Sequence, residues 1–210
     1  MTFAEALLGF AVVAALLTIT PGLDSTLVLR SALTEGRGAA IATGAGINTG
    51  ALVWGAAAGA GASALLLASE WAFTALKLVG AVYLAYLGIR MLVGSFRRTA
   101  HAESDPRPAG SLPAAFARGL LTNLLNPKVG VFYIALIPQF IPDGAGPLGM
   151  GLLLALVHVV ETAIWFAALI AGAHAFRRWL STDAVRRWID RVTGGVLIGF
   201  GALLAVESRA

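Results

Sequence analysis

Two short stretches, Thr20-Pro21-Gly22-Leu23-Asp24 and Asn126-Pro127-Lys128, each place a proline near a charged residue inside a long apolar run. A proline inside a helix removes a backbone donor and clashes with the preceding turn, so each stretch predicts a broken helix. Broken backbone at membrane depth is tolerated only where it is buried in protein or lines a polar cavity. The two stretches occupy corresponding places in the two halves of the chain, which is typical of a transporter's binding site.

The composition indicates a membrane protein of one domain, residues 1–210. Hydrophobic residues make up 58% of the chain and charged residues only 12%, which is too few charges to cover a soluble domain of this size. The absence of cysteine excludes disulfides and thiol chemistry. The net charge of +4 does not indicate nucleic-acid binding, because the basic residues lie in short loops between apolar runs.

Six apolar stretches are long enough to cross a bilayer as helices. We therefore predict an all-α membrane protein of two three-helix repeats, about 1–95 and about 113–210, joined by a polar linker at about 96–112. The first apolar run has Glu5 and no basic residue before it, so we expect a retained span and not a signal peptide. The predicted spans cover about 3–33, 39–68, 71–93, 113–141, 148–176 and 184–206, and the first and fourth are broken at Pro21 and Pro127. The second span is rich in glycine and alanine, and the third span of each half bears glycines, so we expect these residues to let helices pack closely.

The loop charges predict the orientation. The first, third and fifth connections carry arginines, whereas the second and fourth carry Glu70 and Asp143 and no basic residue. Cytoplasmic loops hold the excess of Lys and Arg, so we expect the odd connections in the cytoplasm and both termini outside. Two halves of three spans each then have opposite topologies, which is an inverted repeat.

Asp24 and Lys128 are the charges that follow the two breaks, and each is costly at membrane depth. Asp24 could bind a substrate ammonium, carry protons, or cap the helix that continues after it. Lys128 could bind a substrate carboxylate, pair with Asp24, or extend its stem toward the cytoplasm.

Uncharged polar residues near the breaks are further candidates. The amides of Asn123 and Asn126 could satisfy backbone groups freed by Pro127 or bind substrate. Asn48 and Thr49 could point into the bundle or only form helix-to-helix hydrogen bonds. Thr20 and Gly22 belong to the first break itself.

Glu161 and His158 lie three residues apart in the fifth span, on one helix face. They could form a proton relay or a structural hydrogen-bonded pair. The sequence has no Walker motif and only three scattered histidines, so we expect neither ATP hydrolysis nor a metal site nor a cofactor.

Three stretches carry a family resemblance: residues 17–24 (LTITPGLD), residues 76–84 (LKLVGAVYL), and residues 119–128 (GLLTNLLNPK) leading to Pro138-Gln139-Phe140. In this order they resemble the LysE/RhtB-type exporters of amino acids, over essentially the whole chain. The resemblance implies efflux of amino acids or derivatives across the bacterial inner membrane, driven by an ion gradient. The family usually reads Pro-Gly-Pro at the first break, and Leu23 replaces the second proline here.

We therefore predict a transporter and not an enzyme: a secondary exporter of a zwitterionic amino acid, coupled to proton entry, working by alternating access around the two breaks. Asp24 would face the substrate ammonium and Lys128 its carboxylate. An ion or metal-cation exporter of related architecture is the alternative. A non-transporting scaffold or intramembrane enzyme would not need charges at both breaks. The expected partners are the amino acid and the lipid bilayer, and a homodimer is possible.

Overall fold

The computed structural model describes residues 1–20, 22–68, 70–94, 96, 111–180 and individual positions between 182 and 202. Over these residues the protein is helical, and the described positions between 184 and 202 are helical as well. The predicted all-α class is confirmed. The linker at about 97–110 and most of the predicted sixth span lie outside the described residues.

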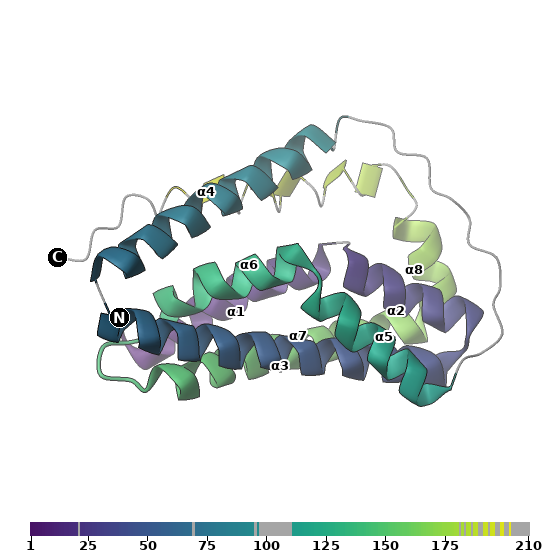
Figure 1. Cartoon of the computed structure of the whole chain (residues 1–210). Coiled ribbons are helices and arrows are strands. Elements are labelled where there is room, and N and C mark those ends of the chain that lie inside the picture. The colour runs from purple at the N-terminus through teal and green to yellow at the C-terminus, as the bar shows by residue number, and fades with distance from the viewer. Residues whose placement is uncertain are drawn as a thin grey trace.

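The helices follow the predicted apolar stretches closely (Figure 1). The prediction for the fifth stretch is wrong at one end: its helix stops at Ala171 and a separate short helix covers residue 176, because Gly172 forms a C-cap there. The elements are α1 (Phe3–Ile19), α2 (Leu23–Thr34), α3 (Arg37–Ala68), α4 (Glu70–Gly94), α5 (Leu112–Leu124), α6 (Pro127–Leu136), the 3₁₀ helix η1 (Ile137–Phe140), α7 (Pro147–Ala171) and α8 (Ala173–Leu180).

The first predicted break separates α1 from α2, whose axes differ by 51°. Thr20 is the C-cap of α1, and its hydroxyl donates a 2.6 Å hydrogen bond to the carbonyl of Leu16. Gly22 is the N-cap of α2 in extended backbone. Pro21 lies outside the described residues.

The second predicted break separates α5 from α6, and this pair is bent by 57°. Asn126 is the N-cap of α6, and its side-chain oxygen accepts the Lys128 N–H at 3.1 Å. Pro127 occupies the first helical position, where a missing N–H leaves no intrahelical bond unmade. The proline therefore starts a helix and does not interrupt one in its middle.

Among the described residues, α7 is long and apolar enough to cross a membrane by itself. The bent pairs α1–α2 and α5–α6–η1 each meet the same criterion when taken as one span. The full count of six spans and their inverted repetition stay predictions.

Glycines bring α3 into close contact with α5 and α7, as the Gly-rich second stretch predicts. A Cβ at Gly46 would overlap the carbonyl oxygen of Phe116 on α5, and one at Gly151 on α7 would lie 2.7 Å from the carbonyl oxygen of Gly55. Small residues let the helix backbones approach to this distance. The packing role expected for these glycines is confirmed.

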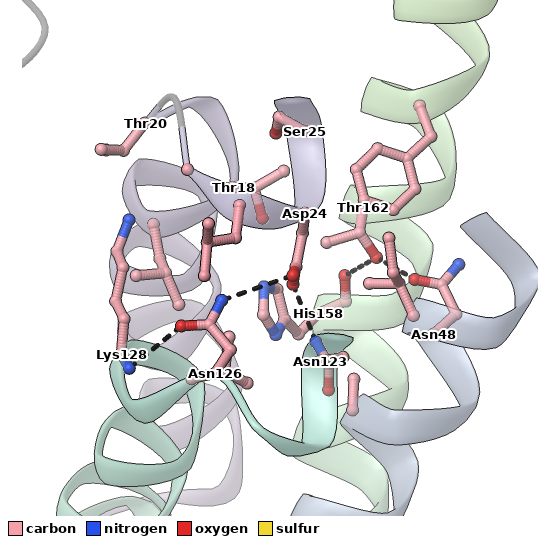
Figure 2. A pocket seen from close by; sticks show the side chains of 17 residues that line it. Thr18, Thr20, Asp24, Ser25, Asn48, Asn123, Asn126, Lys128, His158 and Thr162 are labelled. Carbon is pink, nitrogen blue, oxygen red and sulfur yellow. Dashed lines mark hydrogen bonds between the residues drawn. The ribbon is translucent and has the colours of Figure 1, made fainter. Parts of the chain in front are cut away.

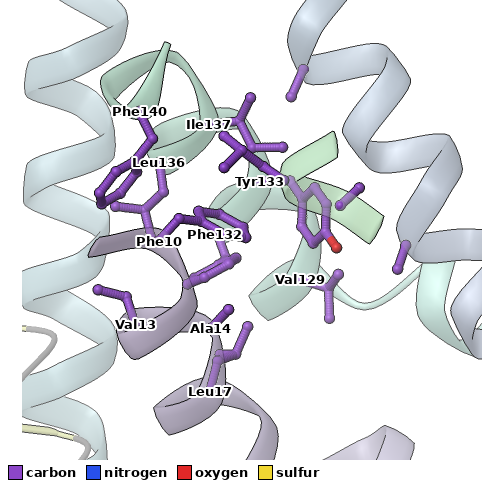
Figure 3. Close-up of a cluster of buried hydrophobic side chains, with 14 of the residues drawn as sticks. Phe10, Val13, Ala14, Leu17, Val129, Phe132, Tyr133, Leu136, Ile137 and Phe140 are labelled. Atoms are coloured by element: carbon purple, nitrogen blue, oxygen red, sulfur yellow. The ribbon is translucent and has the colours of Figure 1, made fainter. Parts of the chain in front are cut away.

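Aromatic side chains join α1 to α6 and η1 in the main hydrophobic core (Figure 3). Phe10 packs against Phe132 and Phe140 with ring centroids 6.0 and 5.7 Å apart. The first helix of one bent pair therefore packs on the second helix of the other bent pair, which brings the two breaks close together.

The helix α4 lies along one side of this bundle, where it contacts α6, with the described positions between 184 and 202 beside it (Figure 1). A Cβ at Gly194 would lie 2.7 Å from the carbonyl oxygen of Gly88. The glycine-bearing third stretches of the two halves thus meet each other.

Candidate functional site

A pocket of about 480 Å³, counting its open mouth, lies where the two breaks meet (Figure 2). Both halves of the chain contribute to its wall, through the facing ends of α1 and α2, the middle of α3, the facing ends of α5 and α6, and the middle of α7. The polar lining residues are Thr18, Thr20, Asp24, Ser25, Asn48, Asn123, Asn126, Lys128, His158 and Thr162.

Asp24, in the first turn of α2, is held by the opposite break. Its carboxylate accepts hydrogen bonds from the side-chain amides of Asn123 at 2.8 Å and Asn126 at 3.3 Å (Figure 2). Because hydrogen bonds to an ionised acceptor are the stronger kind, these amides fix an acceptor inside the pocket and tie the first break to the second.

Asn126 meets one of the two expectations for its amide, since its oxygen caps α6, while its nitrogen holds Asp24. Substrate binding by this amide stays a prediction. Two other polar atoms at this site, the hydroxyl of Thr18 and Oδ1 of Asn123, are buried without a hydrogen-bond partner in the described structure. Buried polar atoms are nearly always paired in proteins.

Lys128, in the first turn of α6, lies on the wall next to the first break. A Cβ added at Gly22 would be 3.8 Å from its ammonium nitrogen. The N-termini of α2 and α6 both adjoin the pocket, so each adds partial positive charge there. A direct pairing of Asp24 with Lys128 stays a prediction.

The opposite wall belongs to α3 and α7. The Thr162 hydroxyl, which also reaches the carbonyl of His158 at 2.9 Å, donates to Oδ1 of Asn48 at 2.6 Å (Figure 2). Trp165 on α7 donates its indole N–H to the hydroxyl of Ser25 at 3.2 Å. Thr162 was not among the site residues predicted from the sequence. It lies four residues after His158, so both side chains are on one face of the helix.

The structure does not bring all the candidates to the pocket. Glu161 does not line it, and one of its carboxylate oxygens is buried without a hydrogen-bond partner among the described residues. His158 lines the pocket, but its bonded neighbour is Tyr133 at 2.7 Å. Thr49 points its hydroxyl to the carbonyl of Ala45, 2.9 Å away on its own helix, and does not line the pocket. No cluster of three or more His, Asp or Glu side chains among the described residues could hold a metal ion.

Comparison with known proteins identifies the family of this chain. The family model of the LysE type translocators matches residues 15–208. The chain belongs to the LysE type translocator family. The resemblance read from the three sequence stretches is therefore confirmed.

Relatives of this translocator extend over nearly its full length. It is 31% identical to the threonine efflux protein of Escherichia coli strain K12, over 90% of this chain and 92% of that protein. It is 30% identical to the homoserine/homoserine lactone efflux protein of Salmonella typhi over the whole of both chains, and 30% identical to the membrane protein YrhP of Bacillus subtilis over 94% and 97%. No solved structure matches this translocator significantly. The translocator is a multi-pass membrane protein, and its family and named relatives are transporters, not enzymes.

Proposed function

We propose that this translocator exports a small neutral amino acid of the threonine or homoserine class across the bacterial inner membrane, driven by proton entry. The observation that carries the proposal is the pocket at the two breaks, which has a carboxylate from one half of the chain and an ammonium from the other on its walls. Asp24 binds the substrate ammonium in this proposal, and Lys128 with the adjoining helix N-termini binds its carboxylate.

The charged residues that line the pocket favour a substrate with a neutral side chain. Asp24 is the acidic member and Lys128 the basic member of the described lining, and the rest is uncharged. A cationic substrate side chain would need a second carboxylate, because an unpaired charge is costly to bury. The same lining weighs against the alternative, an exporter of metal cations, which would need several oxygen or nitrogen ligands together.

Counterflow of labelled amino acids in proteoliposomes tests the proposal. Vesicles preloaded with unlabelled threonine or homoserine should accumulate the labelled form of the same amino acid, whereas lysine-loaded vesicles should accumulate little labelled lysine. Accumulation of lysine alone would refute the neutral-substrate assignment. Transport of a monovalent or divalent cation without any amino acid would establish the rival function.

We propose that both termini lie outside the cytoplasm, which follows from the positive-inside distribution of arginines. In this cysteine-free chain, single cysteines at Ser69 and Ser104 report the two sides of the membrane. An impermeant thiol reagent added to intact cells should label position 69 and spare position 104. The reverse pattern would overturn the orientation.

A further inference from the structure

Tyr133 on α6 lies directly behind His158 of the pocket wall and takes no part in lining it. Tyr133 is 0% exposed and His158 5% exposed, and the phenol oxygen lies 2.7 Å from Nδ1 of the imidazole. Figure 3 shows Tyr133 within the apolar cluster, and Figure 2 shows His158 at the pocket. One hydrogen bond therefore connects the core to the site.

The burial of the phenol decides the direction of this hydrogen bond. A phenol has one hydrogen to donate, and the partner that the structure gives it is Nδ1 of His158. If Tyr133 donates, both atoms are satisfied. If a neutral His158 donated from Nδ1, the phenol hydrogen would be left without an acceptor in a fully buried place, which costs more than the bond contributes.

The tautomer of the imidazole follows from that direction. In a neutral imidazole that accepts at Nδ1, the proton is on Nε2, and the hydrogen bond of one ring nitrogen sets which nitrogen is protonated. Since Nδ1 is taken by Tyr133, Nε2 is the ring atom available to the pocket that His158 lines. The side chain thus has a fixed N–H donor to offer to a bound molecule.

We infer that Tyr133 is a positioning residue: it holds His158 as the Nε2-protonated tautomer, so that His158 donates a hydrogen bond to an acceptor oxygen of the exported amino acid. This inference rests on the proposed function for the identity of the ligand. On the same wall, Oδ1 of Asn48 already accepts a hydrogen bond from the Thr162 hydroxyl. A fixed N–H donor on this wall favours a substrate that has an acceptor oxygen there.

The variant Tyr133→Phe removes the hydroxyl and keeps the ring that packs against Phe132 at 5.9 Å. The apparent KM in counterflow should rise by about 3- to 10-fold, the range for one lost hydrogen bond, with a smaller change in the maximal rate. The control is Tyr86→Phe on the exposed side of α4, which should leave KM unchanged.

Replacing His158 with glutamine separates positioning from general packing. The glutamine amide has its own N–H₂ near the place of Nε2 and needs no tautomer, so Tyr133→Phe should have little further effect in a His158→Gln background. An equal KM rise in both backgrounds would mean that Tyr133 acts through packing, and would overturn the inference.

Nitrogen-15 NMR detects the tautomer of His158 independently of any transport measurement. With His101→Gln and His174→Gln, His158 is the sole histidine, and its two ring nitrogens should show one Nε2-protonated tautomer. Tyr133→Phe should convert this to a mixture. Protonation at Nδ1 in the parent, or an unchanged spectrum in Tyr133→Phe, would refute the positioning role. Absence of amino-acid counterflow in the parent would refute the proposed function instead, and the spectra would still decide the tautomer.

Discussion

Replacing Asp24 with asparagine removes the one carboxylate of the described pocket lining and keeps its shape. The new side chain retains one oxygen for the amides of Asn123 and Asn126, which now reach Asp24 at 2.8 and 3.3 Å. It no longer gives a substrate ammonium an ionised partner. A hydrogen bond to a charged group contributes about 1.5–3 kcal/mol, so the apparent affinity in counterflow should fall by about 10- to 150-fold.

Protein stability should change far less than transport in this variant. The lost hydrogen bond to Asn123 or Asn126 and the removal of a partly buried charge act in opposite directions, so we expect a net change within about 1 kcal/mol. Thermal unfolding in detergent measures this change in stability, and Asp143→Asn in the exposed turn before α7 is the matched control. An apparent affinity of Asp24→Asn within about 3-fold of the parent would be a smaller loss than one charged hydrogen bond accounts for. That result would refute the assignment of Asp24 to the substrate ammonium.

Three further changes test the packing, an ion pair outside the pocket, and the coupling. Gly46→Ala should destabilise the protein by about 1–3 kcal/mol in thermal unfolding, because its Cβ has no room against α5. Gly61→Ala on the same helix, where a Cβ would contact no other atom, should leave the stability unchanged. Equal effects of the two substitutions would contradict the packing role of Gly46. Arg118→Ala should lower the free energy of unfolding by about 1–3 kcal/mol, because it leaves the Glu35 carboxylate without its partner. The side chain of Glu35 is only 10% exposed and lies 2.8 Å from the Arg118 guanidinium. An unchanged melting temperature would show that this ion pair does not stabilise the protein. If Glu161 carries the coupling proton, Glu161→Gln should abolish gradient-driven export and preserve exchange, and loss of both would indicate a structural role.

The local structure of the breaks could be predicted because it depends on neighbours in the sequence. Pro127 can start a helix but cannot continue one, and Asn126 before it is a favoured N-cap. Apolar runs of this length likewise predict helices whatever they pack against. The Gly-rich second stretch predicted close helix contacts for the same reason, since small residues have few other uses at that density.

Contacts between helices could not be predicted in the same way. The sequence puts Glu161 and His158 on one helix face, but the nearest partner of His158 comes from α6, where Tyr133 reads as one more apolar core residue. Thr49 and Asn48 are adjacent in sequence, and only the rotation of α3 against α7 decides that Asn48 faces the pocket. Helical periodicity could have found Thr162, because it lies one turn after His158.

The central claim is that the amino acid binds in the pocket between the two breaks, and protection of a single cysteine tests it most directly. Gly22→Cys places a thiol on the pocket wall, where a Cβ has no neighbour closer than 3.8 Å, and Gly149→Cys is the matched control in open space at the start of α7. In variants that retain counterflow, the transported amino acid should slow alkylation of position 22, half-maximally at its apparent KM, and leave position 149 unaffected. Alkylation of position 22 that saturating substrate does not slow would show that the substrate binds elsewhere.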